Sequence, residues 1–163
     1  TAMPDVQPPD PKRASHPALR KFAPPFTKHL VIQPRIGPVP FRGSSEPMVV
    51  GAWLGLLDPD RPLDALVLAL FSDSLYSPPF IKLDGPGTSP TVDLTIHFRA
   101  HLGEDGMLGE GGVSLAPGEL CLARFSTALV HEGFFEEDGL LWAPDGTLLA
   151  QSRQLAILMP LPG

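Results

Sequence analysis

The stretch Pro62–Leu75 constrains the fold most, because it holds an unbroken apolar run. Every residue from 65 to 71 is apolar, so a helix there has no face for water and must lie in a core or span a membrane. A run of this length is far shorter than the roughly 20 residues that a bilayer requires. We therefore expect a buried central helix over Pro62–Leu75, with Asp58 or Asp60 capping its first turn.

Length and composition favour one globular domain. The chain has 163 residues, 43% hydrophobic and 18% charged, which is enough for a core of its own. A net charge of −6 argues against nucleic acid as a partner, since phosphate backbones select basic patches. The sequence shows no signal-peptide pattern and no apolar run of membrane length, so we expect a cytoplasmic protein with no membrane partner.

The single cysteine, Cys121, lies in an apolar run. It cannot form an internal disulfide, it is compatible with a reducing compartment, and we expect a packed, unreactive thiol. The start Thr1-Ala2-Met3-Pro4 is unlike a natural initiation site, so we expect a fragment or a trimmed chain.

The distribution of proline and apolar residues divides the chain into two regions. Residues 1–29 are rich in proline among scattered charges, which indicates an extended linker or tail without a packed core of its own. Residues 30–163 form the expected domain. The glycine-rich stretch 101–118 indicates a long loop, and it holds no phosphate-binding fingerprint that opens a helix.

Several segments have the alternation or β-rich composition of strands. They are a short edge strand at Leu30–Ile32 that Pro34 stops, then Met48–Leu56, Thr91–Phe98, Leu120–Val130, Phe134–Trp142 and Thr147–Met159. Ala143-Pro144-Asp145-Gly146 joins the last two as a hairpin turn. One helix followed by antiparallel strands predicts an α+β hotdog fold, a curved antiparallel sheet wrapped around one buried helix.

Alternation also predicts which strand faces meet the helix. In Thr91–Phe98 the apolar face is formed by Val92, Leu94, Ile96 and Phe98, and Asp93, Thr95 and His97 face away. In the last strand, small and apolar residues share a face with Gln154. We therefore expect the Gln154 amide to be buried.

Three segments, in this order and spacing, resemble the acyl-CoA thioesterase II family. They are Phe71-Ser72-Asp73-Ser74, then Pro90–Phe98, and then Gly139–Gly146 running into Ala150-Gln151-Ser152-Arg153-Gln154. The resemblance covers roughly residues 40–163 and implies the second hotdog of a family whose members normally carry two in one chain. It therefore implies a second hotdog domain as partner, either in a homo-oligomer or as a separate N-terminal half.

The resemblance also implies a catalytic set. In that family an Asp at the helix end, a Ser or Thr opening the next strand and a Gln in the last strand hold the attacking water, and Asp73, Thr91 and Gln154 match these positions. A carboxylate can orient water or accept its proton, while a hydroxyl and an amide fix it in place. Because simple alternation puts Thr91 with Asp93, the meeting requires a bulge or a strand end. We expect Asp73 to be partly buried at the mouth of an apolar cavity.

The resulting expectation is an acyl-CoA thioesterase half or fragment that acts on an acyl-CoA or acyl-carrier thioester and needs no metal or other cofactor. The alternative is a catalytically silent hotdog module that binds acyl groups or serves assembly. A hydratase or dehydratase would require His97 to face the substrate tunnel.

Other charged residues allow simpler interpretations. We interpret His131-Glu132 and Glu136-Glu137-Asp138 as a solvated turn rather than a metal site. Arg153 either serves an interface or a substrate phosphate, or it is simply exposed.

Overall fold

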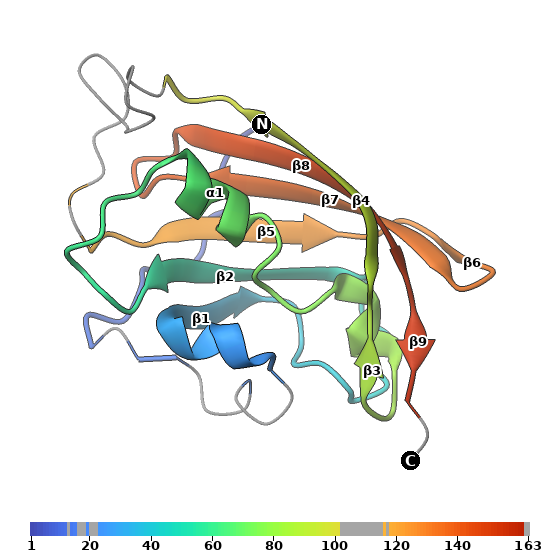
Figure 1. Cartoon of the computed structure of the whole chain (residues 1–163). Helices are drawn as coiled ribbons and strands as arrows, with labels where there is room; N and C mark the ends of the chain where they lie inside the picture. Colours follow the sequence, from blue (N-terminus) through green and yellow to red (C-terminus); the bar gives the residue numbers. More distant parts are fainter. Residues whose placement is uncertain (13, 16–18, 20–22, 102–115, 117, 162–163) are drawn as a thin grey trace.

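A computed structural model describes the chain except residues 13, 16–18, 20–22, 102–115, 117 and 162–163. Among the described residues, one antiparallel sheet has the strand order β1-β2-β5-β7-β8-β4, and β6 pairs with β7. The helix α1 lies against one face of this sheet (Figure 1). This is the expected α+β arrangement.

The elements follow one another with these bounds: 3-10 helix η2 Pro25–His29, β1 Leu30–Ile36, β2 Val49–Leu56, α1 Ala65–Phe71, 3-10 helix η3 Pro78–Lys82, β3 Gly87–Thr88, β4 Thr91–Phe98, β5 Cys121–Ser126, β6 Val130–His131, β7 Phe134–Trp142, β8 Leu148–Ile157 and β9 Met159–Pro160. The short strands β3 and β9 pair with each other in a second, two-stranded sheet. Stretch 101–118 lies largely outside the described residues.

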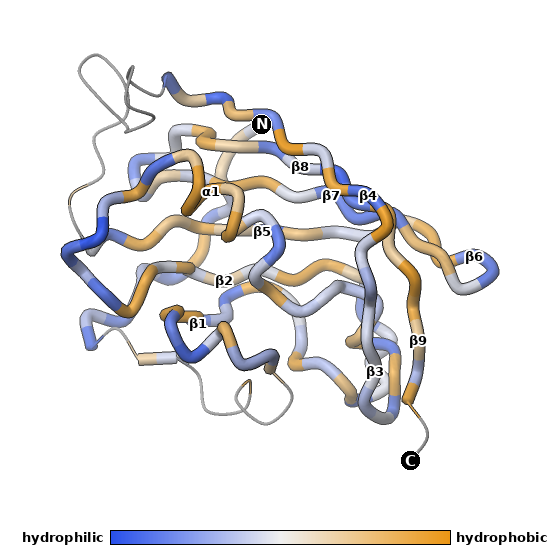
Figure 2. The backbone as a smooth tube through the Cα atoms, viewed as in Figure 1, coloured by the Kyte–Doolittle hydropathy of each residue, from blue (hydrophilic) through white to orange (hydrophobic). Residues whose placement is uncertain are grey.

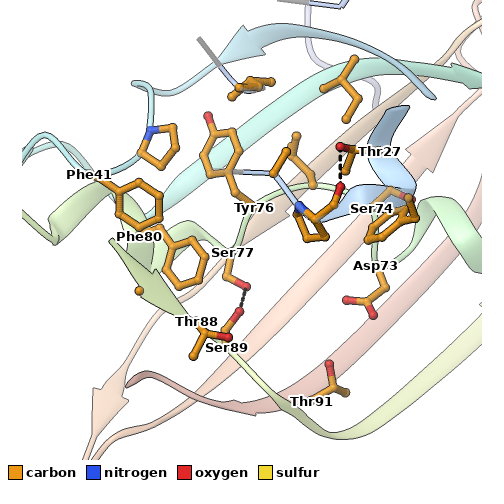
Figure 3. Close-up of a pocket in the computed structure, with 18 residues that line it drawn as sticks. Thr27, Phe41, Asp73, Ser74, Tyr76, Ser77, Phe80, Thr88, Ser89 and Thr91 are labelled. Carbon is orange, nitrogen blue, oxygen red and sulfur yellow. Dashed lines mark hydrogen bonds between the residues drawn. The ribbon is translucent and has the colours of Figure 1, made fainter. Parts of the chain in front are cut away.

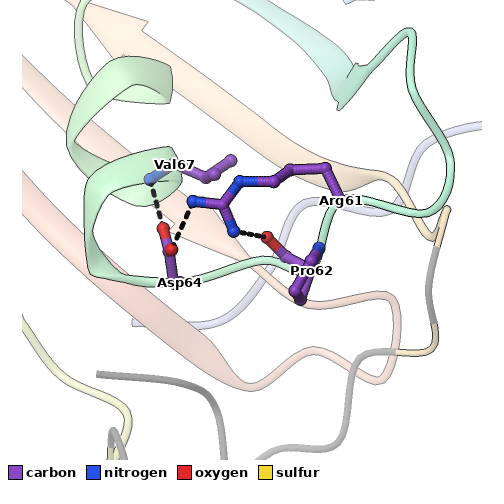
Figure 4. Close-up of polar contacts among 4 residues, drawn as sticks. All are labelled: Arg61, Pro62, Asp64 and Val67. Carbon is purple, nitrogen blue, oxygen red and sulfur yellow. Dashed lines mark hydrogen bonds and ion pairs between the residues drawn. The ribbon is translucent and has the colours of Figure 1, made fainter. Parts of the chain in front are cut away.

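The helix is shorter than expected because its N-cap residue, Asp64, lies inside the span predicted to be helical. Oδ1 of Asp64 accepts a hydrogen bond from the Val67 N–H at 2.9 Å, so helical structure begins at Ala65 and not at Pro62. Arg61 forms an ion pair with the same carboxylate (Figure 4). The prediction that Asp58 or Asp60 caps the helix is wrong.

Only one face of α1 is buried. Val67, Leu68 and Phe71 are buried in the inner core between helix and sheet, whereas Leu66 is 76% exposed and Leu70 39% exposed. Figure 2 shows α1 as largely hydrophobic, so its open side is apolar too. The expected all-round burial is therefore wrong for this chain, because the sheet covers one side of the helix only.

The sheet contains the expected strands with two differences. The predicted strand Leu120–Val130 is broken into β5 and β6 around Thr127. The first strand continues through Pro34, which lies opposite Ala52, because β1 is at an edge of the sheet where a missing N–H is tolerated. The β7–β8 hairpin turns where predicted, with the Gly146 N–H bonded to the carbonyl of Ala143.

Strand β4 forms the other edge of the sheet and pairs with β8. Leu94 and Ile96 are half-buried, as expected for the face toward the helix, but Val92 is 55% exposed and Phe98 41% exposed. The expectation that all four cover the helix is therefore wrong. An edge strand that keeps apolar residues exposed is open to pairing with another chain or domain.

Residues 1–10 of the proline-rich N-terminal segment contain no helix or strand and contact the outer face of the sheet. Leu19 of the same segment is buried in the inner core, and Pro25–His29 form η2. Met3 and Val6 pack on a second apolar cluster that includes Trp53 and Trp142. Indole Nε1 of Trp53 donates to the carbonyl of Gln7 at 2.9 Å. These contacts close the face of the sheet opposite α1.

No helix among the described residues has both the length and the apolar character that a membrane span needs.

Candidate active site

The side chains of Asp73, Thr91 and Gln154 meet at one point of the structure. Nε2 of Gln154 donates to Oδ1 of Asp73 at 3.0 Å and to Oγ1 of Thr91 at 2.7 Å. The amide therefore uses both of its N–H groups on the two partners. The resemblance placed these residues together, and they do lie in direct contact.

A β-bulge brings Thr91 to this point. Thr91 lies opposite Ala156 and Asp93 opposite Leu155, so β4 has one residue more than β8 between the two pairs. The extra residue, Val92, reverses the alternation, and Thr91 thereby shares the inner face with Ala156. The sequence required such a bulge or a strand end, and the structure has the bulge.

Asp73 lies directly after α1. The helix ends at Phe71, and its C-cap residue Ser72 donates its N–H to the Leu68 carbonyl. The Asp73 N–H bonds to the carbonyl of Leu70 at 3.2 Å. The hydroxyl of Ser72 also bonds to the Leu68 carbonyl, at 2.9 Å. These bonds fix the turn that directs the carboxylate toward β4 and β8.

Burial differs sharply within the set. Gln154 is 4% exposed, which confirms the expected burial of its amide, and its hydrogen bonds satisfy the buried N–H groups. Asp73 and Thr91 are exposed, so the expectation of a partly buried Asp73 is wrong for this chain. The carboxylate and the hydroxyl are accessible, while the amide that links them is fixed beneath.

Asp73 and Thr91 line a pocket of about 450 Å³. In Figure 3 they lie at one side of the pocket, and the ring pair Phe41–Phe80 lies at the other. The hydroxyls of Ser77 and Ser89 also line the pocket and are hydrogen-bonded to each other at 2.8 Å. The pocket is thus mixed in character, with apolar side chains and hydroxyls, rather than the apolar cavity that we expected.

Glu137 is the functional candidate that the sequence interpretation missed. The sequence predicts a solvated turn for Glu137, but this residue is only 6% exposed. It lies on β7, directly opposite Gln154 on β8. Burial, and then the nearby charge of Asp73, raise the pKa of Glu137 to about 8. Alternation in β7 could have found it, because Glu137 shares a face with the buried Phe135 and Leu141.

The remaining charged candidates lie away from this point. His97 is exposed and pairs with Gln151, and it does not line the pocket that Asp73 and Thr91 share, so a dehydratase role has no support. Arg153 is exposed and forms an ion pair with Asp138 at 2.8 Å, which matches the plainer of its two interpretations. No three His, Cys, Asp or Glu residues of the described chain are grouped as metal ligands.

Cys121 is fully buried in the core, as expected. Burial raises the pKa of its thiol to about 12. A thiol in this state is a poor nucleophile, as expected for Cys121.

Comparison with known proteins decides the family. The family model of the acyl-CoA thioesterase C-terminal domain matches residues 4–158. The chain belongs to this family. No curated protein matches the sequence.

Solved structures agree with this family and confirm the hotdog fold. A conserved protein of unknown function with a hot dog fold from Alicyclobacillus acidocaldarius is 26% identical, with a TM-score of 0.71 over 100% of this chain and 56% of that one. A putative thioesterase II from Thermobifida fusca is 27% identical, with a TM-score of 0.57 over 81% of this chain and 46% of that one.

An acyl-CoA thioesterase II, TesB2, from Mycobacterium marinum shares the fold at 16% identity, with a TM-score of 0.62 over 100% of this chain and 57% of that one. This acyl-CoA thioesterase domain thus spans about half the length of these structures.

Proposed function

We propose that this thioesterase domain hydrolyses an acyl-CoA or acyl-carrier thioester, with water held by Asp73, Thr91 and Gln154. The observation that carries the proposal is the pair of hydrogen bonds from Gln154 Nε2 to Asp73 and Thr91. Those bonds leave Oδ2 of Asp73 and the O–H of Thr91 without a partner inside the set, and both residues are exposed to the pocket.

Each side chain then has a distinct part in the reaction. Asp73 accepts a proton from water as the water oxygen bonds to the carbonyl carbon of the thioester. Gln154 holds the Asp73 carboxylate in place, and Thr91 orients the same water without competing as a base. Collapse of the tetrahedral intermediate breaks the C–S bond, and the thiolate leaves and takes up a proton.

A second hotdog domain is the proposed partner. Leu66 and Leu70 of α1 and Val92 and Phe98 of the β4 edge are exposed apolar residues. A second hotdog over α1 and beside β4 covers them and encloses the exposed Asp73. The domain spans about half of its solved relatives, which is consistent with a partner hotdog in the same or another chain. We place the protein in the cytoplasm, where reducing conditions suit the free thiol of Cys121.

The test separates a thioesterase from a silent binding module. The complete protein is assayed for thiol release with acyl-CoA substrates of short, medium and long chains. In parallel, binding of the matching non-hydrolysable thioether analogues is measured by calorimetry. Saturable hydrolysis of at least one substrate supports the proposal. Binding of the analogues without hydrolysis of any substrate overturns it and identifies a silent acyl-binding module.

A further inference from the structure

Next to Gln154 of the proposed water site are two buried polar side chains that the mechanism above does not use, Glu137 and Thr127. Glu137 on β7 faces Gln154 on β8 as its cross-strand partner. On the other side of β7, Ser126 at the end of β5 pairs with Asp138. If this antiparallel register is continued by one residue, Thr127 lies opposite Glu137. Thr127 and Glu137 are both buried, at 6% exposure each.

These two side chains carry the buried polar atoms of the described chain that have no hydrogen-bond partner, Thr127 Oγ1 and Glu137 Oε2. A buried polar atom without a partner is destabilising, so a pair of them beside a candidate active site requires a reason. An ionised carboxylate in this place would be worse still, since it can only accept hydrogen bonds and Asp73 is already negative beside it.

The state of Gln154 indicates what Glu137 can do. Both N–H groups of Nε2 are directed to Asp73 and Thr91, so the only polar group that Gln154 can still offer a neighbour is Oε1, an acceptor. A carboxylate cannot bond to an acceptor, whereas a neutral carboxylic acid can donate its O–H to it. Residues directly opposite on antiparallel strands lie within reach of such a contact.

We propose that Glu137 is a positioning residue, whose neutral carboxyl group donates to Gln154 Oε1 and thereby keeps the Gln154 amide turned toward Asp73 and Thr91. This inference rests on the proposed function, because it concerns the same water. Reversal of the amide would direct Oε1 at the Asp73 carboxylate, and two acceptors repel. Glu137 does not touch the water and acts through Gln154.

The electrostatic surroundings agree with this assignment. The pKa of Glu137 is raised to about 8 by burial first and by Asp73 second, so the carboxyl group stays neutral at pH 7. The neighbour on β8, Gln154, and Thr127 after β5 are uncharged. Glu136 and Asp138 on β7 itself alternate to the outer face, where Asp138 forms the ion pair with Arg153.

The test compares Glu137→Gln, Glu137→Leu and Glu136→Gln in the complete protein, between pH 6 and 9.5, with acyl-CoA substrates and a thiol probe that works across this range. Glu136→Gln is the matched control, because it makes the same side-chain change one residue away on the outer face. Circular dichroism verifies the fold of each variant.

We expect kcat of the wild type and of Glu136→Gln to fall as the pH rises through about 8, where Glu137 loses its proton. Glu137→Gln keeps a donor that does not ionise, so its kcat should stay level up to pH 9.5. Glu137→Leu should lose about tenfold in kcat at pH 7, the scale of one hydrogen bond, with binding of a thioether analogue unchanged.

The outcomes are distinguishable. An active wild type whose high-pH decline persists in Glu137→Gln, or a Glu137→Leu variant with full kcat, overturns the positioning role and leaves the proposed thioesterase function intact. A wild type that hydrolyses none of the substrates overturns the proposed function and this inference with it.

Discussion

Gln154 on β8 donates a hydrogen bond to Asp73 at the end of α1, although 81 positions separate them in the sequence. The bond joins the end of the helix to the sheet at the pocket that Asp73 and Thr91 line. Because Gln154 is buried and Asp73 is exposed, the rigid partner holds the accessible one. This relationship is the basis of the predictions that follow.

Thr91 is expected to contribute its hydroxyl and not its methyl group. Thr91→Val should lower kcat by about tenfold, the scale of losing one hydrogen bond, whereas Thr91→Ser should retain most of the activity. Thr95→Val on the same exposed strand is the control and should match the wild type. Steady-state hydrolysis of acyl-CoA measures all three, and equal activities of the Val and Ser variants at position 91 would contradict a role for the hydroxyl.

Glu137 should make the stability of the protein depend on pH. Its pKa is raised from 4.5 to about 8 in the folded state, so between these values the folded state binds the proton that the unfolded state has lost. The contribution of Glu137 to the free energy of unfolding is therefore highest below pH 4.5 and falls as the pH rises to about 8, by up to about 1.4 kcal/mol per pH unit.

Urea unfolding at a series of pH values measures this dependence. In Glu137→Gln the decline should largely disappear, because the amide does not titrate. The same slope in the variant and in the wild type would show that Glu137 is not the group responsible.

The Asp64 cap should stabilise the helix that carries the site. Burial opposes ionisation of Asp64, but hydrogen bonds from Arg61 and from the Val67 N–H outweigh it and lower its pKa. This contribution is thus present above the pKa of unfolded Asp and is lost as the pH falls below it. Asp64→Ala should cost about 1 kcal/mol of unfolding free energy at pH 7. Asp60→Ala should cost much less, since Asp60 does not cap the helix, and equal losses would argue against the cap.

The exposed side of α1 should mediate association. Leu66 is 76% exposed, and a second hotdog over α1 buries it. Light scattering of this chain should show a dimer, and Leu66→Asp should shift it toward the monomer. Leu57→Asp, at a comparably exposed leucine (56%), is the control. A stable monomer of the unmodified chain at high concentration would contradict the pairing.

Much of the fold could be predicted from local pattern. The alternation in β7 and β8 and the turn between them have clear sequence signatures, and these strands lie where predicted. The apolar run of α1 predicted a helix but not that Leu66 faces outward, because a uniform apolar run does not tell which side the sheet covers.

The site was less predictable for two physical reasons. A bulge shifts alternation by one residue without a distinctive side chain, so the inward position of Thr91 depends on the pairing of β4 with β8. Glu137 was hidden by its acidic neighbours Glu136 and Asp138, since a run of carboxylates indicates solvent even when alternation buries one of them.

The most direct test of the proposed mechanism is the hydrolysis rate of Asp73→Asn in the complete protein. Because the amide cannot accept the proton of water, we expect kcat with acyl-CoA to fall by about a hundredfold or more. Asp93→Asn, on the outer side of the bulge, is the matched control and should keep the activity of the wild type. Binding of a thioether analogue should survive in both variants. An Asp73→Asn variant that hydrolyses as fast as the wild type would show that Asp73 does not activate the water.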